Sequence, residues 1–344
     1  MNPNPGASPR LSPPEANPEW EGWLRDAVDF LKRHDDFLIV SHQQPDGDAI
    51  SSTVAAGWLL ERLGKSFFMY NEGPVPSRMR QLWGSDRIVV ADGLPAGRKF
   101  RRVICVDCAD FARIGRAAAW IADDAEILNI DHHATNEGFG TLNLVKVEAA
   151  ATAEIMFELL LAADVEWDKD IANAIYTGLL TDTGGFRYAN TTPYVMSIAS
   201  FLLERGADGP GLAESLLERI SLEQLLMLQR ALPRLSLSPD RKIAWLWVTE
   251  QDLQETGAGN EHLEGLVAYP RNLEGVEVGI LFKQMGEGAV KVSLRSAGLV
   301  DVARVAKAFG GGGHVRAAGC RLEAPLAEAI DRLVAEVRSA LEES

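Results

Sequence analysis

Residues 127–133 read Ile-Leu-Asn-Ile-Asp-His-His. The four residues 127–130 are typical of a short buried strand, and Asp131, His132 and His133 follow at its end. Open α/β sheets build their sites at the carboxyl ends of strands, so a carboxylate and two imidazoles at this place could bind a metal or transfer a proton. Three polar residues could equally begin a surface loop. The residues that follow the other predicted strands decide between these interpretations.

The flanking sequence alternates between predicted strands and helices. We predict strands at residues 36–41, 66–70, 102–106 and 127–130. We predict helices at residues 20–33, 49–63, about 117–122, 150–163, 169–180 and 194–204. Such alternation predicts an α/β fold with a doubly wound, mainly parallel sheet. We assign residues 19–205 to this catalytic domain.

The pattern changes after the glycines at residues 206–211. We predict a helical linker at residues 206–240 and a smaller α/β domain at residues 241–344. Its predicted elements are strands at residues 242–249, 276–283 and 289–296, a helix at residues 300–309, a glycine run, one more strand and a terminal helix. In the strand before that helix, Ser293 and Arg295 share one face with Lys291, opposite Val292 and Leu294.

The composition limits the class of protein. The chain has 344 residues, of which 47% are hydrophobic and 24% charged, and its formal net charge is −15. That charge argues against a protein that coats long nucleic acid, because such binding depends on Lys and Arg. Without a long apolar run, no membrane span is expected. We predict a disordered tail at residues 1–18, and the three cysteines indicate a reducing cytoplasm.

A second polar stretch follows the strand at residues 36–41 and reads His-Gln-Gln-Pro-Asp-Gly-Asp. In an extended loop, residues two apart point to opposite sides, so Asp46 and Asp48 could each serve a different ion. Each residue also has an ordinary explanation, with Asp48 as a helix cap and His42 on the surface. One histidine and two aspartates in a single loop favour the metal interpretation.

Two more aspartates stand at predicted element ends. Asp107 directly follows a buried strand, where a carboxylate must be solvated, paired or metal-bound. Asp182 lies where a helix passes into a glycine-bearing loop, which suits a catalytic loop or a plain cap. Cys105 and Cys108 frame Asp107 as C-x-x-C, but they diverge along the strand and are expected to be small buried hydrophobes.

Together these stretches form a histidine and carboxylate set. Of the six histidines in the chain, three lie in these loops. The candidate metal ligands are His42, Asp46, Asp48, Asp107, His132 and Asp182. Oxygen-rich sites with fewer imidazoles suit Mn²⁺ best, with Mg²⁺, Co²⁺ and Zn²⁺ as alternatives.

The four stretches resemble the motifs of the DHH phosphoesterase superfamily. They read HxxPDGDA at residues 42–49, VDC around residue 107, DHH at 131–133 and TDTGxFRY at 181–188. The resemblance implies that one divalent ion takes His42, Asp46 and Asp107. It implies that the other takes Asp48, Asp107, His132 and Asp182, with Asp107 as the bridge.

The same resemblance implies further catalytic roles. Asp131 would orient the histidine pair, and His133 would face the leaving group or a scissile oxygen. Ser51 departs from the family, whose members often carry glycine there, and we expect it to alter packing only.

A fifth stretch, at residues 310–319, reads Gly-Gly-Gly-Gly-His-Val-Arg-Ala-Ala-Gly. Successive backbone N–H groups in such a run can cup an anion, and the run lacks the Gly-Lys-Ser/Thr ending of a Walker A loop. It resembles the GGGHxxAAG signature of the DHHA1 substrate-binding domain. The predicted substrate-binding residues are Ser293, Arg295, Gly311, Gly312, Gly313 and His314. Relatives bind substrate phosphate with the corresponding arginine, a role that suits guanidinium geometry.

A DHH plus DHHA1 chain is most similar to the nanoRNase/pAp phosphatase (NrnA-type) branch. This resemblance implies Mn²⁺-dependent hydrolysis of short RNA or DNA oligonucleotides to 5′-mononucleotides by a hydroxide that bridges two metals. It also implies removal of the 3′-phosphate from pAp and a homodimer formed through the first domain. The alternatives are a cyclic- or linear-dinucleotide phosphodiesterase, a RecJ-like single-strand exonuclease, and a nucleotide-binding module without catalysis. The glycine run argues against a family II pyrophosphatase.

Overall fold

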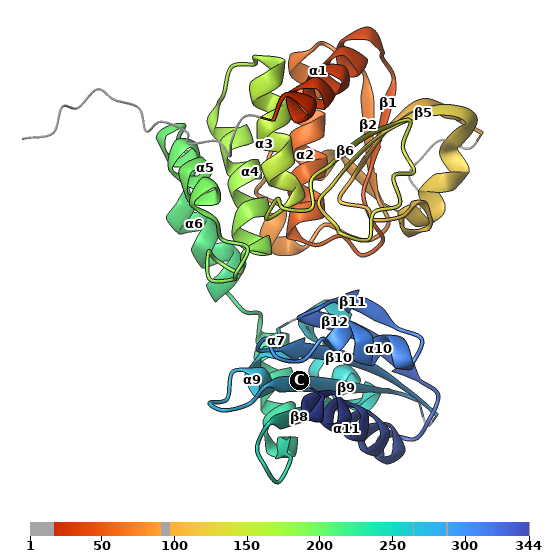
Figure 1. Ribbon diagram of the computed structural model, residues 1–344, viewed down its shortest axis with the longest axis vertical. Coiled ribbons are helices and arrows are strands. Elements are labelled where there is room, and N and C mark those ends of the chain that lie inside the picture. Colours follow the sequence, from red (N-terminus) through yellow and green to blue (C-terminus); the bar gives the residue numbers. More distant parts are fainter. Residues whose placement is uncertain (1–16, 91–96, 264, 287, 344) are drawn as a thin grey trace, which may run out of the picture. The chain divides into compact units, whose positions relative to one another are not determined.

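Figure 1 shows a computed structural model of the protein. It describes residues 17–90, 97–263, 265–286 and 288–343. The chain divides into two compact units, Met1–Arg219 and Ile220–Ser344. Most of the predicted tail lies outside the described residues. Its last two positions are not part of a tail, because Asn17 caps the first helix and Pro18 begins it.

The first unit is built on a six-stranded sheet of order β3-β2-β1-β4-β5-β6. All of its strand pairings are parallel among the described residues. The strands are β1 (Phe37–Val40), β2 (Phe67–Asn71), β3 (Ile88–Val90), β4 (Phe100–Val106), β5 (Ile121–Asp131) and β6 (Leu142–Val145). The carboxyl ends of the neighbouring strands β1, β4 and β5 therefore lie side by side at one edge of the sheet.

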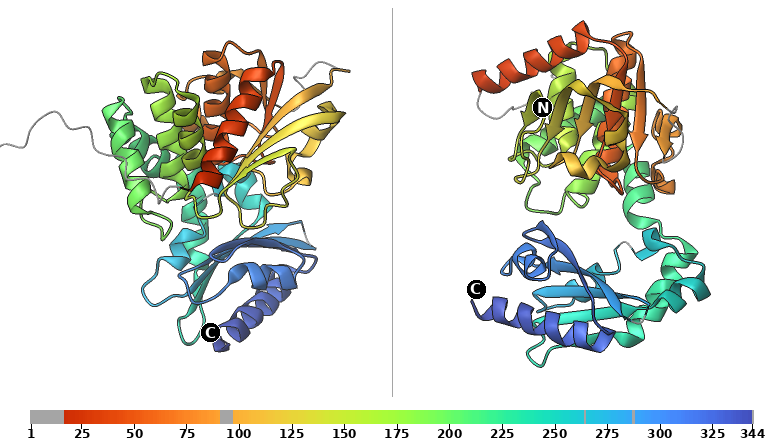
Figure 2. Two further views of the ribbon diagram at one scale, coloured as in Figure 1. Left: turned by 45° about the horizontal axis from the view of Figure 1, so that its top comes forward. Right: turned by 90° about the vertical axis from the view of Figure 1, so that its right-hand side faces the viewer.

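Helices and 3₁₀ turns cover both faces of this sheet (Figures 1 and 2). The helices are α1 (Pro18–Arg33), α2 (Gly47–Arg62), α3 (Thr152–Ala163), α4 (Lys169–Asp182), α5 (Pro193–Glu204) and α6 (Gly209–Ala213). The shorter turns are η1 (Ser77–Met79), η2 (Ser85–Arg87), η3 (Phe111–Trp120) and a π-helical turn, η4 (Glu214–Glu218).

The central strand β1 shows how the two faces are filled. Phe37 and Ile39 pack into the core shared with α1–α5, whereas Leu38 and Val40 pack into the core shared with η3. A strand buried on both faces is typical of parallel sheets. The predicted doubly wound, mainly parallel α/β fold is confirmed.

Three local predictions in this unit were incomplete or wrong. The helix expected near residues 117–122 is the 3₁₀ segment η3, which Gly115 interrupts at a φ of +61°, and β5 already begins at Ile121. The edge strands β3 and β6 were not predicted. They have three and four residues, too few to show a periodicity.

The second unit has a mixed six-stranded sheet of order β11-β12-β10-β9-β8-β7, in which β8 and β9 are parallel. The strands are β7 (Ser236–Leu237), β8 (Ile243–Val248), β9 (Val278–Met285), β10 (Ala289–Ser296), β11 (Gly312–His314) and β12 (Ala317–Leu322). The helices are α7 (Leu222–Ala231), α8 (Glu250–Thr256), α9 (Ala268–Arg271), α10 (Val302–Ala308) and α11 (Leu326–Glu342), with 3₁₀ turns η5 (Leu232–Arg234) and η6 (Asn260–Leu263).

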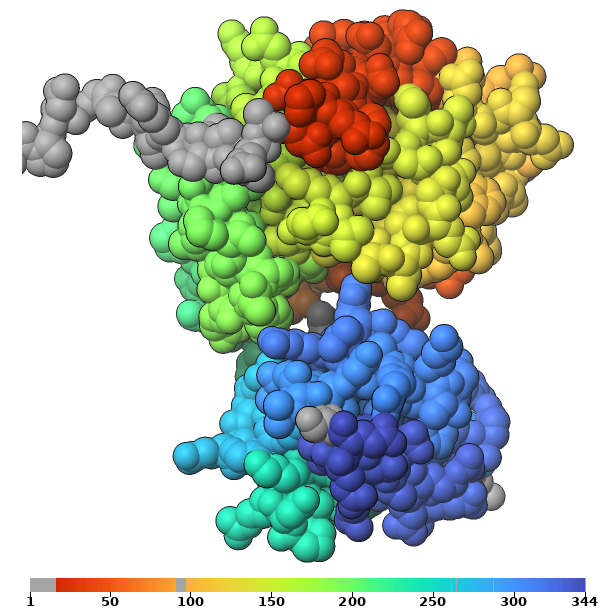
Figure 3. Space-filling view, in the orientation of Figure 1, coloured from red at the N-terminus to blue at the C-terminus, as the bar shows by residue number. Residues whose placement is uncertain are grey.

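The two faces of this sheet differ. One packs on α10 and α11 through residues that include Val292 and Leu294, and Figure 3 shows α11 in dark blue on the surface of the unit. The other face is covered over β8 and β9 by a core that includes Leu246 and Leu281. Over β10, β12 and β11 it is exposed or half-buried, and we call this part the open face. Its residues are Lys291, Ser293, Arg295, Gly312, His314, Ala317, Gly319 and Arg321.

Candidate metal centre

Three adjacent strands deliver side chains to one edge of the first sheet. His42 lies two residues beyond β1, Asp107 directly follows β4, and His132 and His133 follow β5. Because β1, β4 and β5 are parallel neighbours, these residues gather at the same edge, as their positions in the sequence predict.

Helices provide the other candidate ligands. Asp46 is the N-cap of α2, and its Oδ1 accepts hydrogen bonds from the N–H groups of Asp48 and Ala49, both at 3.1 Å. Asp48 lies inside the first turn of α2, and Asp182 is the last residue of α4. The prediction that Asp46 and Asp48 lie in an extended loop is therefore wrong. The helix begins at Gly47, two residues earlier than predicted, and Asp46 is its cap.

The candidate ligands form overlapping groups whose nitrogen and oxygen atoms lie within 4.8 Å of one another. The groups are His42, Asp46 and Asp107; Asp48, His132 and Asp182; and Asp107, His132 and His133. The structure thus brings together all six residues predicted as metal ligands, and it places His133 beside them.

Asp107 stands between the groups. Its Oδ2 lies 3.4 Å from Nε2 of His42. Its Oδ1 lies 3.7 Å from Nε2 of His132 and 3.7 Å from Nδ1 of His133. One carboxylate therefore directs each oxygen toward a different set of partners, which is the arrangement expected of a bridging ligand.

The backbone of Asp107 adopts a left-handed conformation with a φ of +56°. Asp and Asn adopt this conformation more readily than other residues with side chains. The turn after β4 therefore restricts which residues can occupy this position.

Backbone carbonyls orient His42 and His132. Nδ1 of His42 lies 2.8 Å from the carbonyl oxygen of Gln43, and Nδ1 of His132 lies 3.2 Å from that of Ala149. A carbonyl oxygen only accepts, so each Nδ1 carries the proton in these contacts. The Nε2 lone pair of each neutral ring is then directed toward the carboxylates, the usual arrangement of a metal-binding histidine.

Asp131 is fully buried and fixes His133. Its Oδ1 lies 2.7 Å from Nδ1 of His133, and its Oδ2 accepts a hydrogen bond from Nδ2 of Asn136 at 2.6 Å. Nδ2 of Asn136 also donates to the carbonyl oxygen of Cys108, which follows Asp107. Asn136, which the sequence reasoning missed, ties the turn after β4 to the turn after β5.

The N-terminus of α3 holds Asp48. The N–H groups of Thr152 and Ala153 donate to the two oxygens of Asp48 at 2.6 and 3.0 Å, and Oγ1 of Thr152 donates to Oδ1 of Asp107 at 3.0 Å. Ala151, the N-cap of α3, has no side chain that could accept these hydrogen bonds. The carboxylate of Asp48 takes that role across the fold. The sequence offers one signal for this contact, because the helix predicted at residues 150–163 begins without a side chain that could cap it.

Glycines allow α2 and α4 to approach each other. A Cβ atom at Gly47 would overlap the side chain of Thr181, and one at Gly178 would overlap Ser51 and lie 2.7 Å from Oδ1 of Asp48. Ser51, where we expected an effect on packing, is buried against Gly178. This close contact brings Asp48 and Asp182 to the same cluster.

The charges in this cluster are strongly coupled. Burial and the neighbouring Asp107 raise the pKa values of Asp46, Asp48 and Asp182 above those of ordinary carboxyls. Burial opposes the charge of Asp107 as well, but the hydrogen bond and charge of His42 hold the pKa of Asp107 well below its usual range. Burial also disfavours protonated His42 and His132, yet Asp107 raises the pKa of both.

Four carboxylates, of which those of Asp48 and Asp107 are buried, and two histidines with inward lone pairs are the donor set of a divalent cation. A bound cation neutralises the repulsion among these carboxylates. The residues therefore fit metal ions at this edge of the sheet.

The predicted substrate-binding residues lie on the second unit. Register pairs Arg295 with Ala317 and Ala317 with His314, and it pairs Ser293 with Gly319 and Gly319 with Gly312. Directly paired residues point to the same side of a sheet, so these two cross-strand rows lie on the open face. They bring Ser293, Arg295, Gly312 and His314 together, although these residues come from two separate stretches of sequence.

Part of the glycine run is a strand and not a loop. Gly312 to His314 form the edge strand β11, whose backbone pairs with β12. A Cβ atom at Gly311 would overlap the carbonyl oxygen of Gly319, and one at Gly313 would overlap that of Ala317. A Cβ atom at Gly312, in contrast, would meet nothing within 4 Å. Close strand contact explains the glycines at 311 and 313, but not the glycine at 312.

Residues 36–179 match the DHH family, N-terminal domain, and residues 242–343 match the DHHA1 domain. The chain belongs to the DHH family. This DHH protein is 35% identical over 306 residues to the bifunctional oligoribonuclease and PAP phosphatase NrnA of Thermus thermophilus, covering 88% of this chain and 89% of the relative. It is 29% identical over 306 residues to a probable protein of the same name from Streptococcus mutans, covering 84% and 90%.

A solved structure supports the same assignment. The exopolyphosphatase-related protein from Bacteroides fragilis matches with a TM-score of 0.84 and 26% identity, over 94% of this chain and 96% of that one. The predicted DHH/DHHA1 resemblance is confirmed, and the DHH protein is a phosphoesterase.

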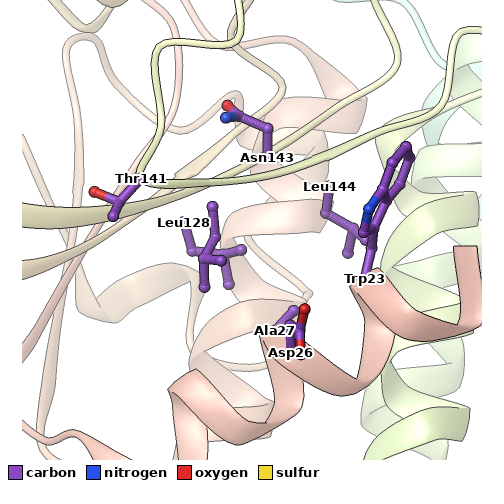
Figure 4. Close-up of a pocket in the computed structure, with 8 residues that line it drawn as sticks. Trp23, Asp26, Ala27, Leu128, Thr141, Asn143 and Leu144 are labelled. Carbon is purple, nitrogen blue, oxygen red and sulfur yellow. The ribbon is translucent and has the colours of Figure 1, made fainter. Parts of the chain in front are cut away.

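Other features of the DHH protein are weaker candidates for a functional site. A cavity of about 360 Å³ lies between α1 and strands β5 and β6, and Figure 4 shows Trp23 and Asp26 on the helix facing it. It contains none of the predicted site residues. Burial raises the pKa of Cys108 to about 12 and that of Cys320 to about 11, so these thiols are poor nucleophiles. Within the described ranges, no helix has the length and apolar character needed to cross a bilayer.

Proposed function

We propose that this phosphoesterase hydrolyses short oligonucleotides to 5′-mononucleotides and also removes the 3′-phosphate of pAp, with two divalent ions, preferably Mn²⁺. The observation that carries the proposal is the position of Asp107, whose two carboxylate oxygens lie between two groups of ligand atoms. The relatives named oligoribonuclease and PAP phosphatase supply the substrate class.

We assign one ion to His42, Asp46 and Asp107. The other is assigned to Asp48, Asp107, His132 and Asp182. A pair of divalent ions, when bound, lowers the pKa of water and offsets charge on a phosphoryl group during displacement. Oxygen donors outnumber nitrogen donors in both sets, which favours Mn²⁺ or Mg²⁺ over softer metals.

The chain itself supplies positioning and proton transfer. Oδ1 of Asp131, 2.7 Å from Nδ1 of His133, accepts a hydrogen bond from that nitrogen and fixes the imidazole ring. His133, 3.7 Å from Asp107, can then donate a proton to the leaving oxygen of the substrate.

The open face of the second unit would recognise the substrate. Arg295 offers a planar cation for a terminal phosphate, and His314 lies in the same cross-strand row. The fold has space for a side chain at Gly312, and the glycine leaves this space to a base or sugar. A short substrate presents few phosphates, so it tolerates the formal net charge of −15 better than a long strand would.

A parallel hydrolysis assay tests this function. A diribonucleotide, pAp, the linear dinucleotide pApA and a 24-mer are incubated with Mn²⁺ and the wild-type protein or Asp107→Asn. Asparagine tolerates the left-handed conformation at position 107, so this variant removes the charge while keeping the turn. The matched control is Asp123→Asn, at an exposed position in β5.

We expect turnover of the dinucleotides and pAp by the wild type and by Asp123→Asn, and none by Asp107→Asn. Rapid digestion of the 24-mer would instead indicate a single-strand exonuclease. Turnover of pApA alone would indicate a linear-dinucleotide phosphodiesterase. Binding of nucleotide without turnover in Mn²⁺, Mg²⁺ or Co²⁺ would contradict the catalytic proposal.

A further inference from the structure

A row of three cations begins on the half-buried end of β9 and continues onto the open face, on the same side of the second sheet. Lys291 on β10 is paired with Lys283 on β9 and with Arg321 on β12. Directly paired residues in antiparallel strands point to the same side, with Cβ atoms about 4.5–5.5 Å apart. The three side chains therefore leave the sheet side by side. We call them the cationic row.

Among the described residues, two carboxylates offset part of the charge of this row. Arg321 pairs with Glu323 at 2.7 Å, and Lys283 contacts Asn260 and feels the charge of Glu250. Lys291 is exposed and has no hydrogen-bond or ion-pair partner among the described residues. Burial, followed by the charge of Lys291, lowers the pKa of Lys283.

Like charges directly opposite each other destabilise a sheet. The cationic row therefore costs stability, and the fold alone gives no reason for it. Unfavourable charge arrangements of this kind are typical of surfaces that bind an opposite charge. In a chain with a formal net charge of −15, a local row of cations is also needed wherever a polyanion is to approach.

The position of the row suggests its ligand. Lys291 lies on the same strand and the same face as Ser293 and Arg295. A strand advances about 3.3 Å per residue, so Lys291 and Arg295 are separated by about 13 Å along β10. That separation is too large for both to hold one phosphate group, but it suits successive phosphates of one extended chain.

We propose that Lys283, Lys291 and Arg321 form a second phosphate subsite, which binds the sugar–phosphate backbone of oligonucleotides longer than a dinucleotide. This inference rests on the proposed function, because it extends the open face that we assign to substrate recognition. Arg295 and His314 hold the terminal group, and the cationic row holds a phosphate further along the strand. The subsite is therefore a determinant of preferred chain length.

Kinetics with substrates of two lengths test the subsite. The Mn²⁺-loaded full-length protein is compared with Lys291→Gln, Lys283→Gln and the double variant on a diribonucleotide and a pentaribonucleotide. We expect the ratio of kcat/KM for pentanucleotide over dinucleotide to fall about threefold per lysine removed, because each lysine neutralises one phosphate. The matched control is Arg332→Gln on α11, whose helix packs on the opposite face.

Binding measured by fluorescence anisotropy in EDTA gives a readout independent of catalysis. A 5′-fluorescein pentaribonucleotide is titrated at several salt concentrations. We expect the slope of log affinity against log salt to become shallower by about 0.7 per lysine removed, while Arg332→Gln keeps the wild-type slope. Because the substitutions relieve like-charge repulsion, the thermal midpoint should not fall.

The outcomes separate the two proposals. The second subsite is wrong, and the proposed function stands, if the wild type hydrolyses the dinucleotide but the lysine substitutions lower kcat/KM equally for both substrates. The same conclusion follows if these substitutions leave kcat/KM for the pentanucleotide unchanged. If the wild type neither hydrolyses nor binds either oligonucleotide, the proposed function fails and the subsite fails with it. A fall in the thermal midpoint together with a uniform loss would show that the lysines serve folding only.

Discussion

The backbone N–H of Thr152 donates a hydrogen bond to Oδ2 of Asp48 at 2.6 Å, although the two residues lie 104 positions apart along the chain. Oγ1 of the same threonine donates to Asp107 at 3.0 Å. Thr152 thus contacts one carboxylate that follows β1, in the first turn of α2, and one that follows β4. It is a positioning residue, because it holds two proposed ligands in fixed orientations without itself being one.

Replacing Thr152 by valine should weaken metal binding. The substitution keeps the shape and the backbone N–H but removes the hydroxyl donor to Asp107, and loss of such an outer hydrogen bond typically reduces metal affinity about tenfold or more. Isothermal titration of the metal-free protein with Mn²⁺ measures the effect. Thr177→Val is the matched control, since the buried hydroxyl of Thr177 has no hydrogen-bond partner in the part of the chain that the structure describes. Equal affinities in the two variants would contradict the role of Thr152.

Asp131→Asn should reduce kcat more than metal affinity. An asparagine amide has only one accepting oxygen, so it cannot accept hydrogen bonds from both Asn136 and Nδ1 of His133 as the two carboxylate oxygens of Asp131 do. The orientation of the His133 ring is then lost. We expect kcat to fall by about a hundredfold or more while the Kd for Mn²⁺ changes much less. Steady-state kinetics and titration of the same preparation decide the point. Parallel losses in kcat and Mn²⁺ affinity would instead show that Asp131 acts through the metal site.

Gly178→Ala should destabilise the first unit. A Cβ atom there would overlap Ser51 and Ala153 and crowd Asp48, and overpacking of this kind costs about 1–3 kcal/mol. Gly22→Ala in α1 is the matched helical control, because its Cβ would meet only Arg25 at 3.8 Å. That control should gain up to about 1 kcal/mol. Thermal unfolding with and without Mn²⁺ measures both, and equal midpoints for the two variants would exclude the close contact.

The metal-free protein should lose stability as pH rises. The pKa values of Asp46, Asp48 and Asp182 are raised in the folded state, as are those of His42 and His132. Groups with raised pKa values bind more protons when folded than when unfolded, so the free energy of unfolding falls with pH from the ordinary carboxyl pKa of about 4 upward. Asp107, whose pKa is lowered, contributes in the opposite direction only in more acidic solution.

Thermal midpoints in EDTA between about pH 5.5 and 8.5 check this prediction. The midpoint should decrease with pH, and Asp48→Asn should flatten the decrease by removing one titrating carboxyl. Added Mn²⁺ should raise the midpoint more at high pH, because the ligands must be deprotonated to bind it. A midpoint that rises with pH in EDTA would contradict the assigned pKa directions.

The strand ends could be predicted from the sequence, and so could the candidate ligands that directly follow a strand, because each follows an apolar run. Asp107 and His132 are such cases, since a parallel sheet brings the ends of its neighbouring strands together. The start of α2 could not be predicted. Glycine is a poor helix former, so the helix was expected to begin at Ala49, whereas Asp46 caps it and Asp48 lies inside it.

Contacts between distant segments could not be predicted either. The pairing of α3 with Asp48 and the bonds of Asn136 depend on how helices pack on the sheet. A single sequence records which residues can accept or donate, but not which distant partner the tertiary structure supplies. The strand β11 shows the same limit, because four glycines indicate a loop by propensity and only pairing with β12 makes part of the run a strand.

The cluster at the edge of the first sheet takes its first member from position 42 and its last from position 182. During synthesis, His42 and Asp46 leave the ribosome long before Asp182 exists. No nascent fragment that lacks α4 can hold the complete set, so the cluster can assemble only after the chain has been made as far as Asp182. Mn²⁺ binding would therefore report that synthesis and folding have passed α4, and a chain interrupted before Asp182 would not acquire the full site.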